Sequence, residues 1–163
     1  MIIYEEILKE FQRQRVKYVL AGGIAFNLLG GYRSTLDMDI LVQMTDNNLH
    51  KVIKILKKAG YHVKQPIDPI KITDKAIRQD WIKNKHLKAL NFYKSKGSYE
   101  EVDIIIDSPV SFEKAVKGAK KIKAGKLNLK VVSAGDLIKM KKVTGRNKDR
   151  ADIKELKLIN KIK

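Results

Sequence analysis

Hydrophobic and polar positions recur with two different periods along the chain, and the changes of period separate helices from strands. Ile3, Ile7, Leu8 and Phe11 recur at helical spacing in residues 2–15, which predicts an amphipathic helix. Short apolar runs bounded by glycine, proline or polar turn residues predict strands instead. On this basis we expect further helices at residues 24–29, 45–59, 73–81, 111–119 and 137–145 and from 149 onward, and strands at 16–20, 37–42, 61–64, 87–94 and 99–107, with a pair of short strands in 121–132.

Turn residues predict which of these strands are neighbours. Lys96-Gly97-Ser98 separates the strands at 87–94 and 99–107, and Ala124-Gly125 divides residues 121–132. Short glycine-containing connections of this kind join antiparallel strands. We therefore expect a hairpin at 87–107, and a second short hairpin or a pair of strands at 121–132.

Length and composition restrict the class of protein. The 163 residues, of which 44% are hydrophobic and 33% charged, match a folded domain, and we expect a single domain over residues 1–163. Because no apolar run approaches the roughly 20 residues of a membrane span and Glu5 and Glu6 follow the first four residues, we expect a cytoplasmic protein without a membrane segment. The absence of cysteine excludes disulfides and thiolate chemistry, and three scattered histidines disfavour a zinc site.

The positive charge is concentrated in the second part of the chain. The net charge is +17, yet residues 1–50 hold 5 Lys and Arg against 6 Asp and Glu, whereas residues 114–163 hold 17 against 4. A basic surface of this kind favours a polyanionic partner such as RNA. The alternative is a lysine-rich solvated surface, because the excess is Lys rather than Arg and few aromatic residues are interleaved for base stacking.

Residues 19–42 (VLAGGIAFNLLGGYRSTLDMDILV) combine a glycine turn with an acidic strand. Alternate side chains of a strand share a face, so Asp37 and Asp39 point the same way, their Cα atoms about 7 Å apart. Carboxylates so arranged suit a hard divalent cation. Gly22 and Gly23 lack side chains, so their backbone N–H groups can approach phosphate oxygens.

A later strand supplies a third carboxylate. Asp103 interrupts the apolar residues of EVDIIID, and an unpaired buried carboxylate is costly, which indicates a metal, a cation or exposure at a sheet edge. Asp107 lies at the strand end beside Ser108-Pro109, a turn position, and is the weaker candidate. Three carboxylates from strands suit phosphoryl or nucleotidyl transfer with two metal ions.

These residues resemble the signature of the DNA polymerase beta-type nucleotidyltransferase superfamily, in which a hydrophobic residue and Gly-Gly or Gly-Ser precede an acidic-x-acidic strand. Residues 136–153 (DLIKMKKVTGRNKDRADI) resemble the C-terminal helical motif of AbiEii-like and related bacterial nucleotidyltransferases. The resemblance implies an α/β (α+β) fold, in which a small mixed sheet carries helices and residues 133–163 form a C-terminal helical segment.

The resemblance also implies roles for individual residues. Asp37, Asp39 and Asp103 would be catalytic and would bind Mg²⁺ or Mn²⁺, with an NTP as substrate. Asp149 and Asp152 would orient the nucleotide-binding cations or hold the helices together. Gly23 departs from the serine that often stands at its position, which leaves phosphate binding there to the backbone. The nucleotide-binding residues would be Gly22, Gly23, Arg33, Ser34, Thr35, Lys141 and Arg146.

The expected reaction is transfer of an NMP from an NTP to an acceptor hydroxyl, with release of pyrophosphate. The basic surface favours RNA, in particular a tRNA 3′ end, as the acceptor, in the manner of a nucleotidyltransferase toxin. The alternatives are a hydroxyl of a protein or of an antibiotic, and a non-catalytic binding module that pairs with a cognate toxin or antitoxin protein.

Overall fold

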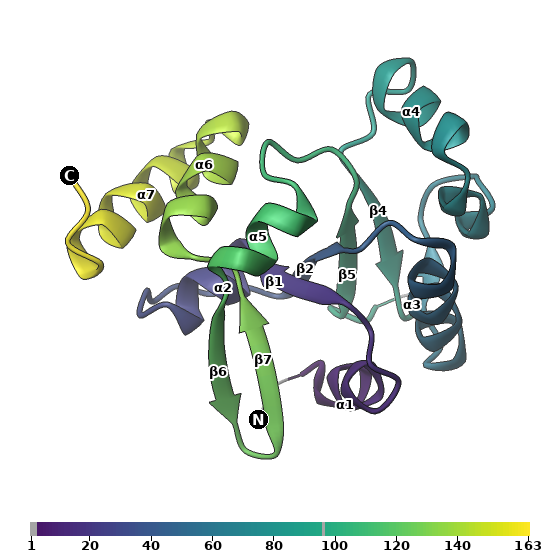
Figure 1. The fold of residues 1–163 in the computed structure, drawn as a ribbon, viewed down its shortest axis with the longest axis horizontal. Helices are drawn as coiled ribbons and strands as arrows, with labels where there is room; N and C mark the ends of the chain where they lie inside the picture. Colours follow the sequence, from purple (N-terminus) through teal and green to yellow (C-terminus); the bar gives the residue numbers. More distant parts are fainter. Residues whose placement is uncertain (1–2, 96) are drawn as a thin grey trace.

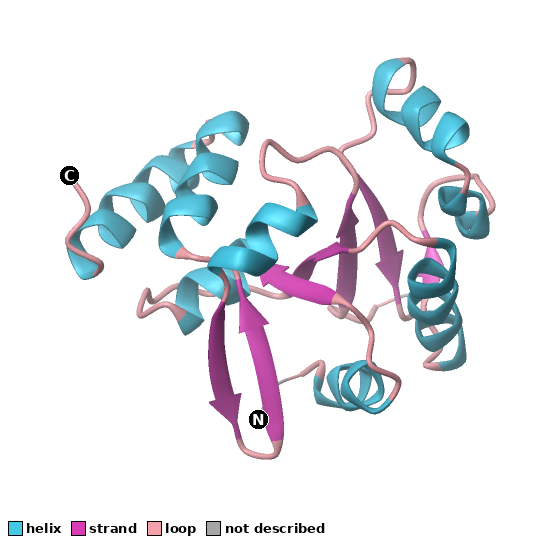
Figure 2. Cartoon of the chain, viewed as in Figure 1, coloured by secondary structure: helices cyan, strands magenta, loops and turns pink. Residues whose placement is uncertain are grey.

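The computed structural model describes residues 3–95 and 97–163, and this part of the chain forms a seven-stranded mixed sheet with seven α-helices and one 3-10 helix around it (Figures 1 and 2). The α/β class and the C-terminal helices expected from the sequence are thereby confirmed. In chain order the elements are α1 (Glu5–Arg13), β1 (Tyr18–Ala21), α2 (Gly22–Leu28), β2 (Asp37–Val42), α3 (Asp46–Lys58), β3 (His62–Val63), η1 (Pro69–Thr73), α4 (Lys75–Lys83), β4 (Ala89–Tyr93), β5 (Glu101–Ile105), α5 (Phe112–Gly118), β6 (Lys120–Ala124), β7 (Leu127–Val131), α6 (Ala134–Thr144) and α7 (Asn147–Ile159).

The strand with the two predicted carboxylates lies in the middle of the sheet. The strand order is β3-β4-β5-β2-β1-β7-β6, so β2 lies between β1, which is antiparallel to it, and β5, which is parallel. Asp39 is paired in register with Ala21 on one side and Asp103 on the other. The end of β1 and the middle of β5 therefore meet at one residue of β2.

Alternation of side chains separates the core from the site along β2. Met38, Ile40 and Val42 are buried in the main hydrophobic core, while Asp37 and Asp39 alternate with them. Helices α1 and α3 contribute Phe11 and Leu56, among others, to the same core. Burial of one face thus leaves the carboxylates on the other.

Most predicted boundaries are confirmed within a few residues. Thr45 caps α3 by accepting a hydrogen bond from the Asn48 N–H, and Gly60, at φ +91°, follows the helix as its predicted stop. The predicted β4–β5 hairpin forms, and β6 and β7 form the second one, although Lys96 of the first turn lies outside the described residues. None of the helices in residues 3–95 and 97–163 is long and apolar enough to cross a membrane.

The glycine pair is placed differently from the prediction. We expected Gly22 and Gly23 to close the first strand and the helix to begin at Ile24, but α2 begins at Gly22, directly after β1. Gly22 has φ +63°, a left-handed conformation that glycine adopts without strain. The strand and the helix are therefore joined without a loop.

Candidate functional site

Asp39 and Asp103 form the centre of the site. They are opposite one another on adjacent parallel strands, and Asp37 lies two residues before Asp39 on the same face. Burial, followed by the charge of Asp103, raises the pKa of the Asp39 carboxyl to about 7. Burial and the charge of Asp103 also raise the pKa of Asp37. The charged forms of Asp37 and Asp39 are therefore disfavoured, and a bound cation would offset this cost.

A neighbouring strand orients Asp103. Asn91 on β4 is paired with Asp103 across the hairpin and donates a hydrogen bond from Nδ2 to Asp103 Oδ1, with a length of 2.7 Å. Gln65 in turn donates to Asn91 Oδ1 at 2.6 Å and accepts from the Asn91 N–H at 3.1 Å. Both polar groups of the Asn91 amide are thus engaged, and Asp103 Oδ1 is held in one direction.

Sequence reasoning missed Asn91 and Gln65. The sequence does contain a signal for Asn91. A hairpin that turns around Gly97 pairs residue 91 with residue 103, so the polar Asn91 in an otherwise apolar strand can be predicted to lie beside Asp103. Gln65 lies in the segment after β3, whose path no local pattern predicts.

The loop between α2 and β2 is held at both ends. Asn27 donates from Nδ2 to the Arg33 carbonyl at 2.9 Å and accepts from the Arg33 N–H at 3.1 Å. The Tyr4 hydroxyl donates to the Leu36 carbonyl and accepts from the Glu101 N–H, so it joins the starts of β2 and β5. Ser34 and Thr35 are therefore presented by a fixed backbone.

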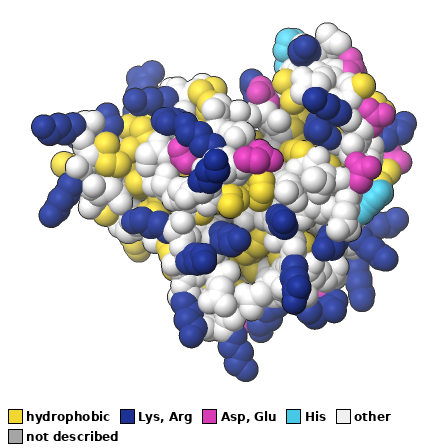
Figure 3. Space-filling model, viewed as in Figure 1, with side chains coloured by type: hydrophobic (Ala, Val, Ile, Leu, Met, Phe, Trp, Pro, Cys, Tyr) yellow, Lys and Arg dark blue, Asp and Glu magenta, His cyan; other side chains and the backbone are white. Residues whose placement is uncertain are grey.

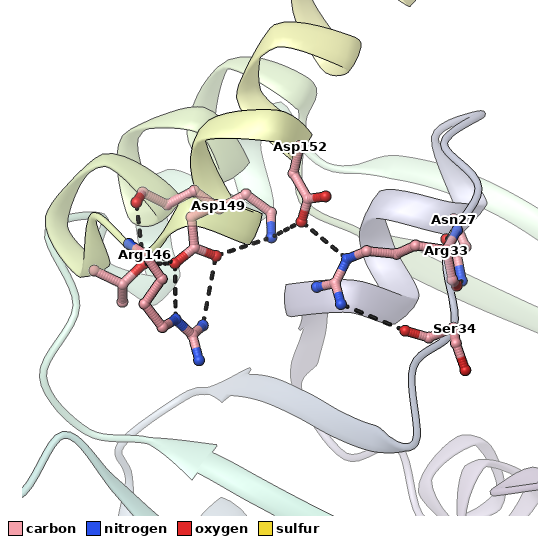
Figure 4. A network of polar contacts seen from close by, with 8 residues as sticks. Asn27, Arg33, Ser34, Arg146, Asp149 and Asp152 are labelled. Carbon is pink, nitrogen blue, oxygen red and sulfur yellow. Dashed lines mark hydrogen bonds and ion pairs between the residues drawn. The ribbon is translucent and has the colours of Figure 1, made fainter.

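A network of charged side chains, three of them buried, connects this loop with the C-terminal helices (Figure 4). Asp152 Oδ2 accepts from Arg33 Nε at 3.0 Å and from Lys141 Nζ at 2.8 Å. Lys141 also lies 3.6 Å from Asp149 Oδ1, and Arg146 Nε donates to Asp149 Oδ2 at 2.8 Å. Lys141, Asp149 and Asp152 are only 6%, 1% and 3% exposed.

The cations of this network favour the charged form of Asp149. Burial would raise the pKa of Asp149, but hydrogen bonds from Arg146 and Thr144, together with the charges of Arg146 and Lys141, outweigh it and hold that pKa at about 2. Asp149 and Asp152 thus hold cations from three segments of the chain together, as the resemblance implied for helix packing.

Two cavities meet at Asp39. The smaller, of about 420 Å³, lies at the Asp37 end of β2 and the larger, of about 730 Å³, between the end of β5 and α6. Gly22, Asp39, Lys141 and Arg146 line both. The smaller cavity also contains Gly23, Arg33, Ser34, Thr35, Leu36, Asp37, Asp103 and Lys148, and the larger one Lys88, Ala89, Ile105, Asp107, Ser108, Pro109, Leu137, Met140, Val143, Thr144 and Asp149.

Every residue predicted for the site therefore lines the smaller cavity. The segments that supply these residues are far apart in the sequence: the β1–α2 junction, the loop before β2, the strands β2 and β5, and the C-terminal helices. Asp107, the weaker candidate, lines the other cavity and forms an ion pair of 2.7 Å with Lys88. Its separation from the trio agrees with the lower weight given to it.

The carboxylate trio fits a divalent cation in its chemistry. Carboxylate oxygens are hard donors of the kind that Mg²⁺ and Mn²⁺ prefer, and burial and the charge of Asp103 raise the pKa of Asp37 and of Asp39. Within residues 3–95 and 97–163, however, no three acidic or histidine side chains are gathered into a ready-made metal site. The metal role of Asp37, Asp39 and Asp103 accordingly stays a prediction.

Comparison with known proteins adds a family and a fold. A family model described as "Nucleotidyltransferase of unknown function (DUF6036)" matches residues 1–163. The chain is similar to the crystal structure of ANT(2")-Ia in complex with adenylyl-2"-tobramycin, with a TM-score of 0.63 and 12% sequence identity, covering 96% of this chain and 86% of that one.

A second similar structure is the lincomycin-bound lincosamide antibiotic adenylyltransferase LnuA, with a TM-score of 0.60 and 18% identity, covering 94% of this chain and 93% of that one. A sequence search of curated proteins found no match. At these identities the likeness to solved structures shows the fold alone. The finer resemblance to AbiEii-like proteins stays a prediction.

Proposed function

Because the chain belongs to DUF6036, a family of nucleotidyltransferases, we propose that it transfers a nucleoside monophosphate from an NTP to an acceptor hydroxyl and releases pyrophosphate. The observation that carries the proposal is the smaller cavity, which is lined both by three carboxylates from two strands and by the cations Arg33, Lys141, Arg146 and Lys148. Carboxylates that hold metal and cations that hold phosphate are the two components that this chemistry needs.

In the proposed reaction the acceptor oxygen forms a bond to the α-phosphorus while the bond to the bridging oxygen of the β-phosphate breaks. Asp37, Asp39 and Asp103 would bind Mg²⁺ or Mn²⁺, which neutralises phosphate charge and lowers the pKa of a bound hydroxyl. Asn91 occupies Asp103 Oδ1, which leaves Oδ2 to take the proton of the acceptor hydroxyl. Arg33 and Lys141 would hold the departing pyrophosphate.

The two cavities suggest where the substrates lie. In a phosphoryl transfer the attacking and leaving oxygens are roughly in line. The smaller cavity extends from Asp39 towards Asp37, and the larger one extends from Asp39 towards Ile105, farther along the parallel strand pair. With the leaving pyrophosphate beside Arg33, the acceptor hydroxyl would approach from the larger cavity.

The charge of the larger cavity favours an anionic acceptor, and RNA is our first choice, with a tRNA 3′ end as the specific case. Two acidic residues of this cavity other than Asp39 are already paired, Asp107 with Lys88 and Asp149 with Arg146. Apolar side chains of Ile105, Met140 and Val143 offer surface for a base.

The molecular surface is also rich in cations. Figure 3 shows Lys and Arg side chains spread over much of the molecular face, with fewer acidic ones. Of the 17 cations in residues 114–163, Lys141 and Arg146 are the ones that form ion pairs with other described residues. Unpaired lysines of this kind would attract an RNA backbone.

An antibiotic hydroxyl is the second candidate acceptor, favoured by the two similar structures, which contain an adenylylated tobramycin and a bound lincomycin. The net charge of +17 would repel a polycationic aminoglycoside. Asp107 and Asp149 of the larger cavity, which could attract it, already form ion pairs with Lys88 and Arg146. RNA is therefore the first candidate acceptor. A role as a toxin with a cognate antitoxin partner is part of the same proposal.

The test is label transfer from α-³²P-labelled ATP, GTP, CTP and UTP, each with Mg²⁺, to total RNA, a protein extract, tobramycin or lincomycin. We expect labelled RNA with wild type and at least about 100-fold less with Asp39→Ala. Label on protein or drug instead would overturn the RNA acceptor but keep the reaction. Transfer to none of the four, with Asp39→Ala equal to wild type, would overturn the reaction itself.

A further inference from the structure

We infer that the Thr35 hydroxyl binds the pyrophosphate part of the NTP, and that residue 23 is glycine because this hydroxyl needs its space. The inference rests on the proposed function and assigns one side chain within that site. It concerns a hydroxyl that local sequence reasoning could not separate from ordinary turn chemistry.

The first observation is that the backbone does not require glycine at position 23. Gly22 has φ +63°, but Gly23 is not among the residues with positive φ. A Cβ on residue 23 would instead lie 2.5 Å from Thr35 Oγ1, 2.9 Å from Thr35 Cβ and 3.1 Å from Arg33 Nη2. Contacts below 3.0 Å are closer than packed side chains allow, so Thr35 occupies the space that a side chain at 23 would fill.

The second observation is that the Thr35 hydroxyl has no partner in the described part of the chain, although it lies in the polar cavity. Asp37, Asp39 and Asp103 line the same cavity. The hydroxyls of Ser108, Ser111 and Ser133, elsewhere in the chain, each form a hydrogen bond with a backbone group. A hydroxyl can donate to a phosphate oxygen, and a charge-assisted bond of this kind is stronger than a neutral one.

The third observation is that Thr35 is held in place before any ligand binds. Asn27 holds the Arg33 backbone by two hydrogen bonds, and the Tyr4 hydroxyl holds the Leu36 carbonyl. Threonine is branched at Cβ, which restricts its χ1 angle. The hydroxyl therefore loses little conformational entropy on binding.

The position along the sheet indicates which phosphates it would bind. Thr35 lies at the Asp37 end of the site, beside Arg33, and the larger cavity lies at the other end. Since the proposed reaction places the leaving pyrophosphate beside Arg33, and Thr35 lies next to Arg33 at Gly23, Thr35 would contact the same pyrophosphate.

Binding of inorganic pyrophosphate with Mg²⁺, measured by calorimetry, tests the inference without knowledge of the base. Thr35→Val keeps the shape and removes the hydroxyl, and we expect a Kd about 10- to 100-fold higher. Thr35→Ser keeps the hydroxyl and should remain close to wild type. In transfer assays Thr35→Val should raise the KM for the NTP by a similar factor.

A double variant tests directly whether side chains at positions 23 and 35 compete for the same space. Gly23→Ser alone forces the new side chain against Thr35 and should weaken pyrophosphate binding. Gly23→Ser combined with Thr35→Gly supplies a hydroxyl from the other side of the same space and should recover part of the affinity that Thr35→Gly alone loses. Thermal unfolding of each variant checks that it is folded.

The outcomes separate the two proposals. If wild type binds pyrophosphate and transfers nucleotide, but Thr35→Val and Thr35→Ala bind pyrophosphate as wild type does, the role of Thr35 is wrong and the reaction stands. Equal binding by Gly23→Ser and wild type would also contradict the inference. If wild type neither binds pyrophosphate nor transfers a nucleotide, both proposals fail.

Discussion

A Cβ atom on Gly22 would lie 1.8 Å from Oδ2 of Asp39. The carboxylate at the centre of the site thus lies directly against the backbone of the β1–α2 junction, because Asp39 pairs with Ala21 on the neighbouring strand. Gly22 is required for two reasons, its positive φ and this contact. The absent side chain at position 22 determines where the Asp39 carboxylate can lie.

We expect Gly22→Ala to lower both stability and activity. An alanine in the left-handed region costs about 1–2 kcal/mol, and the contact with Asp39 adds to this. Gly125→Ala is a matched control, because Gly125 has φ +61° and nothing within 4 Å of a Cβ. Urea unfolding should show the larger loss for Gly22→Ala, and label transfer should fall for this variant alone. Equal effects of the two substitutions would contradict the close approach to Asp39.

The pKa of Asp39 predicts that the metal-free protein is less stable at higher pH. The folded carboxyl has a pKa of about 7, against about 3.9 in an unfolded chain. From pH 4 to 7 the unfolded state loses this proton first, so the free energy of unfolding falls as pH rises and levels off above 7.

Asp39→Asn removes this titration. In EDTA the variant should gain about 1 kcal/mol or more relative to wild type between pH 5 and pH 8, measured by urea unfolding. Mg²⁺ should stabilise wild type at pH 8 and have less effect on the variant. A stability difference between the two proteins that is independent of pH would show that Asp39 does not titrate as described.

Asn91→Ala should weaken metal binding and activity together. Loss of the hydrogen bond to Asp103 Oδ1 frees that carboxylate, and removal of a residue that orients a metal ligand costs about 10- to 100-fold. Mn²⁺ binding followed by electron paramagnetic resonance measures the first effect, and label transfer the second. Asn128→Ala, on the outer strand pair, is the control. Unchanged Mn²⁺ affinity in Asn91→Ala would rule out the proposed orienting role.

Asp152→Ala should destabilise the protein by about 3 kcal/mol, because it leaves Lys141 buried with less compensating charge and releases Arg33. Replacement of both partners, Lys141→Met with Asp152→Leu, should cost less than the sum of the single changes. Glu155→Ala on the same helix is the control and should change stability by less than about 0.5 kcal/mol. Additive effects of Lys141→Met and Asp152→Leu would show that the network does not couple the two helices.

Local chemistry was sufficient to predict most of the helices and strands and the β4–β5 hairpin, but not the 3-10 helix at Pro69–Thr73. Thr45 marks the start of α3 and Gly60 follows its end. The turn around Gly97 sets a register that pairs Asn91 with Asp103. The start of α2 at Gly22 was missed, since a Gly-Gly pair reads locally as a turn, whereas pairing of β1 with β2 ends the strand at Ala21.

By itself, the sequence determined which residues are candidates for the chemistry: two carboxylates on one face of a strand, a third in an apolar strand, and cations in a helical segment. The periodicity of hydrophobic residues and the spacing of carboxylates involve residues only a few positions apart, so both patterns are visible in the sequence itself. Only the tertiary structure decided that Asp152 binds Arg33 and Lys141 at one oxygen, and that Thr35 takes the space beside Gly23. Such contacts join residues up to 119 positions apart, and they form because long-range packing brings the segments together.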